Sequence, residues 1–354
     1  MPFLMNKNRI ALCFSFNKYG SIDFIEINNK DLLPEMLKDG NIVYLHKWLR
    51  SRCIDLSRRN ARILLEQLKI NNNSIDPVMY NKGTSLIDTF WIKYNESEAF
   101  NDNNLYIKAF DTKIFDIALN GALQSLPLGI NTELTNIGSF NKAWSKKGNN
   151  WWLYKLGSKK HIYAELFTYY LGKSLGMNMA VYKPLSDQNL ITSLNFTDES
   201  ISLEHYFSFK YAFNDTSYNE STVYHNMKSI GLHHSYLDIL LLDGIVCNPD
   251  RHEFNLGVLK NTNTGNLVSL APNYDNNLAL GAESNLTLYL LREYLDTFGL
   301  PEHQIKYINT LSQDLMLSID TQVKTETGFT DLDTTDIFNY FNQVIIALKS
   351  YQSC

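Results

Sequence analysis

The sequence predicts an α+β fold with two lobes, a small strand-rich lobe and a larger helical lobe, preceded by an N-terminal accessory domain. Three observations lead to this expectation. Residues 3–28 read as short strands, a polar stretch with two glycines begins a new strand pattern after residue 119, and the chain beyond residue 200 is mainly helical in its periodicity. We therefore expect three domains, at residues 1–118, 119–200 and 201–354.

The composition is that of an ordinary globular protein. The 354 residues are 44% hydrophobic, which is enough for a sizeable core. A formal net charge of −5 argues against a chain-wide attraction to nucleic acid or to an anionic membrane. The four cysteines lie far apart, and no run approaches the roughly 20 apolar residues of a membrane span. We expect a cytoplasmic protein without membrane contact.

Two helices are expected in the accessory domain. Ile42, Leu45 and Leu49 form an apolar stripe at helical spacing, and Ser57 can cap a second helix that runs through Leu68. Basic residues gather at residues 47–62, and they are Lys47, Arg50, Arg52, Arg58, Arg59 and Arg62. They could present a surface to nucleic acid or to an acidic partner, although a solvated face is the commoner reason for such a cluster.

The middle of the chain alternates strands, a helix and a hairpin. A strand is expected at residues 151–156, and a helix from about His161 to Leu175, where Gly176 ends it. Further strands fit residues 180–183 and 189–196, and residues 256–270 read as a hairpin whose turn spans 261–266.

Lys155 and Glu165 are expected to form an inward-facing pair. Strand alternation places Lys155 on the same face as the apolar residues Trp151 and Leu153. In the following helix, Glu165 falls on an apolar stripe, and an unpaired buried carboxylate is costly. A strand lysine that pairs with a helix glutamate and touches nucleotide phosphates is the arrangement that protein kinases use.

The stretch CNPDRHEFN follows an apolar helix and carries Asp250 and Asn255 at the Asp-x4-Asn spacing of a kinase catalytic loop. A second acid, Asp275, follows the predicted hairpin in the stretch PNYDNN. Phosphoryl transfer needs a carboxylate that orients the attacking hydroxyl and accepts its proton. It also needs an amide oxygen and a second carboxylate to hold magnesium. We expect Asp250 to be the base, and Asn255 and Asp275 to be the magnesium ligands.

Four segments together resemble the HipA-type serine/threonine kinases, which include HipA-like and CtkA-like bacterial proteins. They are NWWLYKLGS, HIYAELFTYYLGKSLGM, LLLDGIVCNPDRHEFNLGVL and LAPNYDNNLALG. Residues 135–285 carry most of the resemblance. The chain departs from an ordinary protein kinase because its triplet is Asp-Arg-His, because no Phe-Gly follows Asp275, and because it has neither a GxGxxG loop nor an Ala-Pro-Glu segment.

The resemblance implies a bilobal protein-kinase-like fold and transfer of the γ-phosphate of ATP to a protein hydroxyl, with magnesium as the metal. Carried over residue by residue, it implies that Lys155 contacts the phosphates and that Glu165 anchors it. Asp250 would be catalytic, and His252 would support the loop that contains it. The protein substrate is not named by the resemblance. The setting also stays open between a toxin–antitoxin pair, phage defence and an effector role, and the partner could be an antitoxin or another neighbouring gene product.

Two further parts of the nucleotide site follow from the same resemblance. Asn195 and Phe196 end a strand where the family has its adenine-binding hinge. In this family the loop that covers the phosphates contains a serine, and autophosphorylation of that serine ejects the loop and silences the enzyme. Ser139 is the best-placed equivalent in this sequence, and Ser145 is the second choice.

Two other classes of function stay open. A metal hydrolase could use Asp250, His252 and Asp275, although such a site would normally recruit more ligands at close spacing, and the sequence has no HExxH motif. The main alternative is a catalytically weak, nucleotide-binding pseudokinase or regulator. In that reading, the basic N-terminal helices at residues 47–62 would bind nucleic acid or a partner protein.

Overall fold

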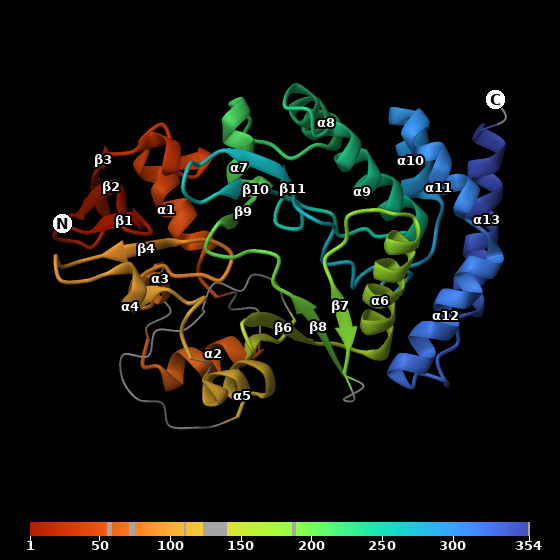
Figure 1. The fold of residues 1–354 in the computed structure, drawn as a ribbon, viewed down its shortest axis with the longest axis horizontal. Helices are drawn as coiled ribbons and strands as arrows, with labels where there is room; N and C mark the ends of the chain where they lie inside the picture. The colour runs from red at the N-terminus through yellow and green to blue at the C-terminus, as the bar shows by residue number, and fades with distance from the viewer. Residues whose placement is uncertain (55–58, 71–74, 110, 123–139, 186–188, 353–354) are drawn as a thin grey trace. The chain divides into compact units, whose positions relative to one another are not determined.

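The computed structural model describes residues 1–54, 59–70, 75–109, 111–122, 140–185 and 189–352 (Figure 1). The chain forms two compact units. The first comprises residues 1–156, 194–216 and 257–271, and the second comprises residues 157–193, 217–256 and 272–354. The polypeptide therefore passes between the units several times. The three predicted domains, each continuous in sequence, stay a prediction.

The first unit begins with an antiparallel sheet of strand order β3-β2-β1-β4. Its strands are β1 (Phe3–Asn6), β2 (Arg9–Phe16), β3 (Ile22–Ile27) and β4 (Phe90–Lys93). β2 contains the predicted strand, and the chain turns towards β3 at Gly20, whose φ of +80° is one that glycine adopts without strain. The short strands expected at residues 3–28 are confirmed.

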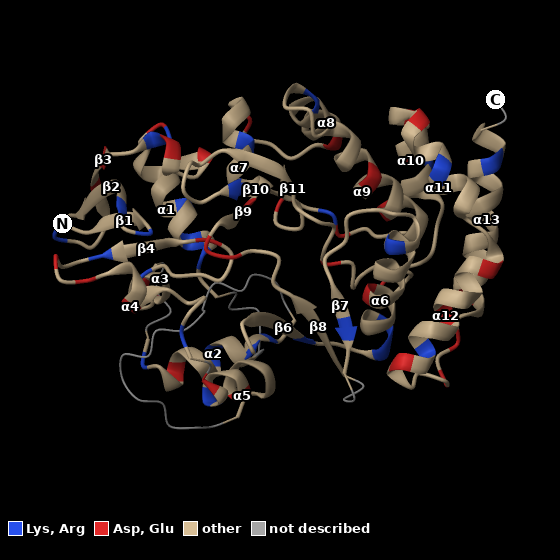
Figure 2. Ribbon diagram, in the orientation of Figure 1, with Lys and Arg blue, Asp and Glu red and all other residues tan. Residues whose placement is uncertain are grey.

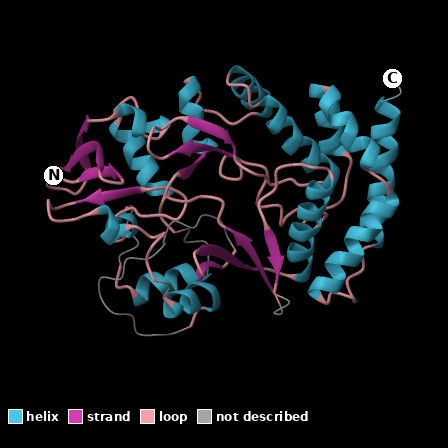
Figure 3. Cartoon of the chain, in the orientation of Figure 1, coloured by secondary structure: helices cyan, strands magenta, loops and turns pink. Residues whose placement is uncertain are grey.

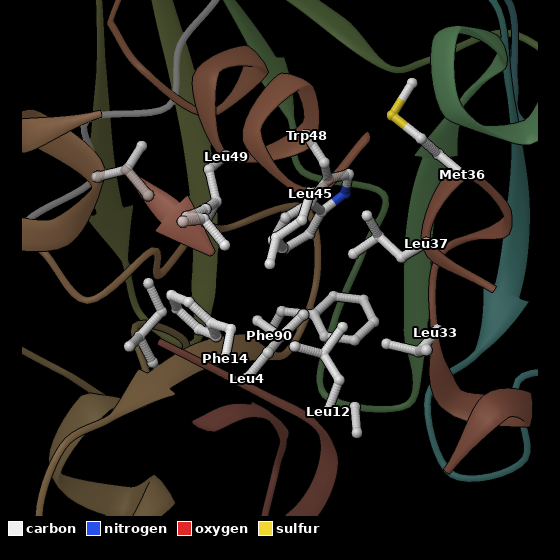
Figure 4. Packing of buried hydrophobic residues seen from close by; sticks show 14 of the residues in the cluster. Leu4, Leu12, Phe14, Leu33, Met36, Leu37, Leu45, Trp48, Leu49 and Phe90 are labelled. Atoms are coloured by element: carbon white, nitrogen blue, oxygen red, sulfur yellow. The ribbon is translucent and has the colours of Figure 1, made fainter. Parts of the chain in front are cut away.

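Helix α1 (Ile42–Ser51) shares an apolar core with this sheet. Asn41 caps the helix because its side chain accepts a hydrogen bond from the amide of Val43. Leu45 and Leu49 are fully buried, as their helical spacing predicts. Figure 4 shows them packed among side chains of the sheet and of the segment before α1. The N-terminal region therefore has an apolar core of its own. Burial of each such side chain stabilises the folded state by roughly 1.5–3 kcal/mol.

Two groups of short elements complete the helical part of this unit. Between β3 and α1 lie the 3₁₀ turns η1 (Lys30–Leu32) and η2 (Glu35–Leu37). The remaining helices are α2 (Arg59–Gln67), α3 (Asp76–Tyr80), α4 (Phe100–Asn103), α5 (Thr112–Asn120), α7 (Tyr206–Phe209) and the 3₁₀ turn η3 (Lys210–Phe213). α2 and α5 bury a second apolar cluster between them, which includes Leu64 and Ile117. The second predicted helix is confirmed from Arg59 onwards, whereas Ser57 lies outside the described residues.

Two antiparallel hairpins follow in the same unit. The first joins β5 (Lys142–Lys147) to β6 (Asn150–Leu156) and places Lys155 opposite Lys142. The second joins β10 (Gly257–Asn261) to β11 (Leu267–Leu270), and β9 (Ile201–His205) pairs with β10 to give the strand order β11-β10-β9. The second hairpin matches the sequence prediction. For the first hairpin only β6 was predicted as a strand, because the residues of β5 were expected to form a polar stretch before it.

The second unit is mainly helical (Figure 3). Its helices are α6 (Lys159–Ser174), α8 (Glu220–Ser229), α9 (His233–Val246), α10 (Tyr289–Phe298), α11 (Glu302–Thr310), α12 (Gln313–Thr327) and α13 (Thr335–Gln352). β7 (Tyr182–Pro184) pairs antiparallel with β8 (Leu190–Leu194). None of the helices in the described part of the chain is both long and apolar enough to cross a membrane.

Helix α6 is the central helix of the candidate site. Ser158 and His161 form a capping box at its start, and the chain leaves the helix through Gly176 at φ +77°. The predicted helix and its glycine stop are therefore confirmed. Buried residues occur on all sides of α6, and the ring of Phe167 stacks on that of Phe341 from α13 at 5.3 Å. This packing fixes α6 within the second unit.

Candidate functional site

The loop after α9 brings Asp250 and Asn255 together. α9 ends at Cys247 with φ +50°, and the side chain of Asn248 then accepts a hydrogen bond from the amide of Asp250 at 3.2 Å. The Nδ2 of Asn255 donates to the backbone oxygen of Asp250 at 2.9 Å and to its carboxylate Oδ2 at 3.3 Å. Asn255 is buried and Asp250 is half-buried. The two residues singled out by their spacing thus contact each other directly.

His252 lies at the turn of this loop. Its backbone oxygen accepts a hydrogen bond from the amide of Asn255 at 2.9 Å, and its Nδ1 accepts one from the amide of Phe254 at 3.1 Å. Its Nε2 lies 3.9 Å from Oδ1 of Asp250. The imidazole is largely exposed, so its hydrogen bond to the amide of Phe254 stabilises the loop at the protein surface. This placement agrees with a supporting role for His252, which stays a prediction.

Asp275 follows the hairpin in a left-handed backbone conformation, with φ +61°, and its amide donates to the hydroxyl of Tyr182 at 3.0 Å. Its charge acts on Asp250. Burial raises the pKa of Asp250, His252 opposes the increase, and the carboxylate of Asp275 raises it further. Two carboxylates that repel one another at a partly buried site form a place where a cation is favoured.

Arg251 is the residue that organises these loops, and the sequence analysis gave it no role. Its guanidinium is buried and binds both carboxylate oxygens of Asp243 on α9, with Nε to Oδ2 at 2.8 Å and Nη2 to Oδ1 at 2.9 Å. Such a two-point contact fixes the plane of the guanidinium. The available signal was Asp243 itself, an acid within the apolar run LLLDGIV, since a buried charge needs a partner.

The other donors of Arg251 hold the two candidate metal loops. Nη1 donates to the backbone oxygen of Asn255 at 2.6 Å and to that of Tyr274 at 3.0 Å. Nη2 donates to the side-chain oxygens of Asn273 and Asn276, both at 2.9 Å. One buried side chain therefore contacts the segment that contains Asn255 and both sides of Asp275.

Glu165 also contacts the segment around Asp275. Its side chain is completely buried on α6, which confirms that this helix face points inward. Its Oε1 accepts a hydrogen bond from the backbone amide of Asn276 at 2.8 Å. The buried carboxylate is thus bonded to the chain directly after Asp275.

Comparison with solved structures identifies the fold that carries this site. HipA of Shewanella oneidensis MR-1, solved in a toxin–antitoxin complex with HipB and operator DNA, matches with a TM-score of 0.57. The match covers 100% of this chain and 98% of that one at 14% sequence identity. The fold is HipA-like. The resemblance predicted from the sequence is confirmed at the level of the fold.

A second solved structure, the proinflammatory kinase CtkA of Helicobacter pylori, is 15% identical and has a TM-score of 0.37. That match covers 59% of this chain and 95% of CtkA. No protein-family model and no curated protein matches the chain. The relationship to HipA therefore rests on the three-dimensional fold and on the sequence segments described above.

Three further residues were predicted to belong to the site, namely Lys155, Ser139 and Ser145. Lys155 is buried on β6, at 7% exposure, and its expected contact with Glu165 stays a prediction. Ser139, the first choice for autophosphorylation, lies outside the described residues. Ser145, the second choice, is buried on β5.

Asn195 and Phe196 follow directly after β8, where the adenine hinge is expected. Both ends of the Asn195 side-chain amide form hydrogen bonds within the protein. Nδ2 donates to the backbone oxygen of Leu86 at 2.9 Å, and Oδ1 accepts from the amide of Thr197 at 3.2 Å. The backbone amide of Asn195 donates to the backbone oxygen of Trp151 at 2.9 Å, so any contact of Asn195 with an adenine would fall to its backbone oxygen. The hinge assignment stays a prediction.

The basic cluster needs one correction. Arg52 was expected to share a surface with its basic neighbours, and this is wrong because its side chain is buried. Its guanidinium pairs with Asp88 at 2.6 Å, donates to the backbone oxygen of Gly83 and lies over the ring of Trp48 at 4.5 Å. Figure 2 shows the lysines and arginines of the helices in blue, those of α1 and α2 among them. The exposed members among the described side chains are Lys47, Arg50 and Arg62.

Proposed function

We propose that this chain is an ATP- and magnesium-dependent serine/threonine protein kinase that transfers the γ-phosphate of ATP to a protein hydroxyl. The observation that supports this best is the hydrogen-bonded pair of Asp250 and Asn255, joined to the segment around Asp275 by the buried Arg251. The ordered set of acid, amide and acid is the one that protein kinases use for phosphoryl transfer. A HipA-like fold is a scaffold on which such a set is expected.

In this proposal Asp250 orients the attacking hydroxyl and accepts its proton. A carboxylate with a raised pKa is a better proton acceptor near neutral pH than an ordinary aspartate. Burial and the charge of Asp275 raise the pKa of Asp250 in this way. The bond from Asn255 Nδ2 to Oδ2 fixes the orientation of the carboxylate.

The residues present fit magnesium. Asn255 uses its Nδ2 to bind Asp250, so its amide is oriented with Oδ1 available for a cation. The carboxylate of Asp275 would be the second ligand. Magnesium prefers such hard oxygen ligands and commonly takes one or two from protein, with the rest from phosphates and water. When bound, it would neutralise charge on the β- and γ-phosphates.

The remaining roles complete the proposal. Lys155 would contact the phosphates, with Glu165 anchoring it while also holding the amide of Asn276. The backbone at Asn195 and Phe196 would receive the adenine. Ser139, or Ser145 as second choice, would be the regulatory autophosphorylation site.

A binding role for the N-terminal region is the second candidate. The HipA of Shewanella oneidensis was solved with the protein HipB and operator DNA, so a partner protein or DNA is a reasonable class of ligand here. The supporting observation is the exposure of Lys47 and Arg50 on α1 and of Arg62 on α2. This candidate is compatible with catalysis or could replace it in a pseudokinase.

The test of the main proposal is Asp250→Asn, assayed with radiolabelled ATP and magnesium for autophosphorylation and for labelling of a general substrate protein. Transfer should fall by about 10²–10⁴-fold because the proton acceptor is lost. ATP affinity should stay within several-fold because Asp250 acts on the hydroxyl. Asp296→Asn, at an exposed position of α10, is the matched control. Undiminished labelling by Asp250→Asn would remove Asp250 from this role.

A further inference from the structure

The hairpin β10–β11 joins the two loops that carry the candidate magnesium ligands. One residue separates Asn255 from Gly257, where β10 begins, and four separate Leu270, where β11 ends, from Asp275. The amide of Ala271 donates to the backbone oxygen of Gly257 at 2.9 Å and closes the base of the hairpin. Because each residue spans at most about 3.6 Å, the chain allows Asn255 to lie at most about 7 Å from Gly257, and Asp275 at most about 14 Å from Ala271.

Lys260 is the last residue but one of β10 and forms a buried ionic cluster. Its ammonium group is 2.9 Å from Oε1 of Glu35 in η2 and 3.0 Å from Oε2 of Glu204 in β9. The residue is only 6% exposed. Burial lowers the pKa of Lys260, but the two carboxylates raise it by more, so the side chain stays charged. A buried charge of this kind is strongly held because its removal would leave the partners uncompensated.

The carboxylates of this cluster have further partners. Oε1 of Glu204 accepts hydrogen bonds from the amide of Glu35 at 2.7 Å and from the hydroxyl of Ser208 at 2.6 Å. Glu35 also pairs with Lys38 at 2.8 Å. Two lysines therefore balance two glutamates. A buried network of charged hydrogen bonds of this kind rigidifies the elements that it joins.

The turn of the hairpin is held by the same N-terminal region. Lys7 donates to the side-chain oxygen of Asn263 at 2.7 Å, and Arg9 donates to the backbone oxygen of Asn263. Gly265 has φ +76°, and a Cβ atom there would lie 1.8 Å from the backbone oxygen of Asp31. Only glycine fits so close an approach. The turn therefore packs directly on the backbone of the segment before η2.

We propose that Lys260, through Glu35 and Glu204, positions the two magnesium-binding loops. The segment from Lys7 to Glu35 would hold the hairpin in place through its contacts with Lys260 and with the turn. This inference rests on the proposed function. Lys260 would touch neither substrate nor metal, so it is a positioning residue. Its effect would pass along the chain. The register of β10 sets the points at which the chain leaves the hairpin, towards Asn255 on one side and towards Asp275 on the other. Sites of this kind depend on such supporting contacts.

The test measures how much magnesium is needed for half-maximal thermal stabilisation of the full chain by ATP. Lys260→Met keeps the length of the side chain and removes its charge. It should raise this magnesium concentration about tenfold, the low end of what loss of a supporting residue does to metal affinity. Lys260→Arg restores the positive charge and should show a smaller increase. Lys306→Met, at an exposed position of α11, is the control and should match wild type.

Arg9→Ala is the second variant, and it decides the matter if Lys260→Met does not fold. Arg9 is exposed, so its loss removes the contact with the turn and leaves the core intact. It should shift the magnesium dependence in the same direction, whereas Lys18→Ala, in the exposed turn between β2 and β3, should not. If ATP and magnesium stabilise wild type and every folded variant requires the same magnesium, the positioning role is wrong and the kinase proposal stands. If they do not stabilise wild type, both fail.

Discussion

The carboxylate of Glu165 accepts a hydrogen bond of 2.8 Å from the backbone amide of Asn276, the residue after Asp275. Glu165 is fully buried on α6, and the amide of a buried residue has no water to bond instead. This contact couples the position of α6 to the backbone that presents Asp275. It gives Glu165 a structural role that does not depend on its proposed pairing with Lys155.

Replacing Glu165 should separate hydrogen bonding from charge. Glu165→Ala would leave the amide of Asn276 without its acceptor, and an unsatisfied buried donor costs about 1–3 kcal/mol. Glu165→Gln keeps an acceptor oxygen and should lose less stability. Urea denaturation of both variants measures the difference, with Glu302→Ala at an exposed site of α11 as control. Equal losses for Gln and Ala would show that the hydrogen bond to Asn276 contributes little.

The pair Arg251–Asp243 should show strong coupling. Arg251→Met leaves the buried carboxylate of Asp243 uncompensated, which typically costs about 3–5 kcal/mol. The double variant Arg251→Met, Asp243→Leu removes both charges and should be less destabilised than the sum of the two single changes. Denaturation of wild type, both single variants and the double variant completes the cycle. Additive losses would mean that the two side chains act independently, against the geometry described here.

Asp250→Asn should stabilise the protein in the absence of metal at neutral pH. Burial and the charge of Asp275 raise the pKa of Asp250 in the folded state above its unfolded value. An acid with a raised folded pKa favours folding when protonated, so this contribution is present at low pH. It is lost as the pH rises from the unfolded pKa through the folded one.

Thermal unfolding with a metal chelator should therefore give a higher Tm for Asp250→Asn than for wild type at pH 7. The difference should disappear towards pH 3, where Asp250 is protonated in both states. Asp296→Asn should show no such trend, since its carboxylate is exposed. A variant that is less stable than wild type at pH 7 would contradict the repulsion between Asp250 and Asp275.

Salt dependence distinguishes the two candidate functions of the N-terminal region. If Lys47, Arg50 and Arg62 contact phosphates, replacing all three by Ala should flatten the slope of log affinity against log salt by about 2–3 units. For our main proposal we expect γ-phosphate transfer and no nucleic-acid binding at moderate salt. Salt-sensitive binding without transfer would reverse this preference. Arg52→Ala is unsuitable as a binding variant because it breaks a buried ion pair.

Local patterns predicted local structure well. The stripe of Leu45 and Leu49 predicted a helix, and α1 confirms it. The Asp-x4-Asn spacing predicted that Asp250 and Asn255 act together, and they form a hydrogen bond because residues five positions apart in one loop can contact each other directly. In each case the sequence signal and the contact lie within a few residues of one another.

The partners of buried arginines could not be predicted in this way. Arg251 binds side chains more than 20 residues further along the chain, and Arg52 binds Asp88, which is 36 residues away. Nothing near Arg52 in the sequence distinguishes it from the exposed arginine at position 50. Only the folded chain separates a structural arginine from a surface one, since both types look alike in composition and spacing.

The left-handed backbone of Asp275, at φ +61°, limits which amino acids can occupy this position. Glycine, asparagine and aspartate tolerate such a conformation, whereas β-branched and bulky residues are strained in it. A saturation library at position 275, sorted for cellular abundance, should thus retain Gly, Asn and Asp. The same library sorted for phosphoryl transfer should retain Asp alone. Mutational tolerance measured by abundance would then report the backbone at this position, and tolerance measured by activity would report the ligand.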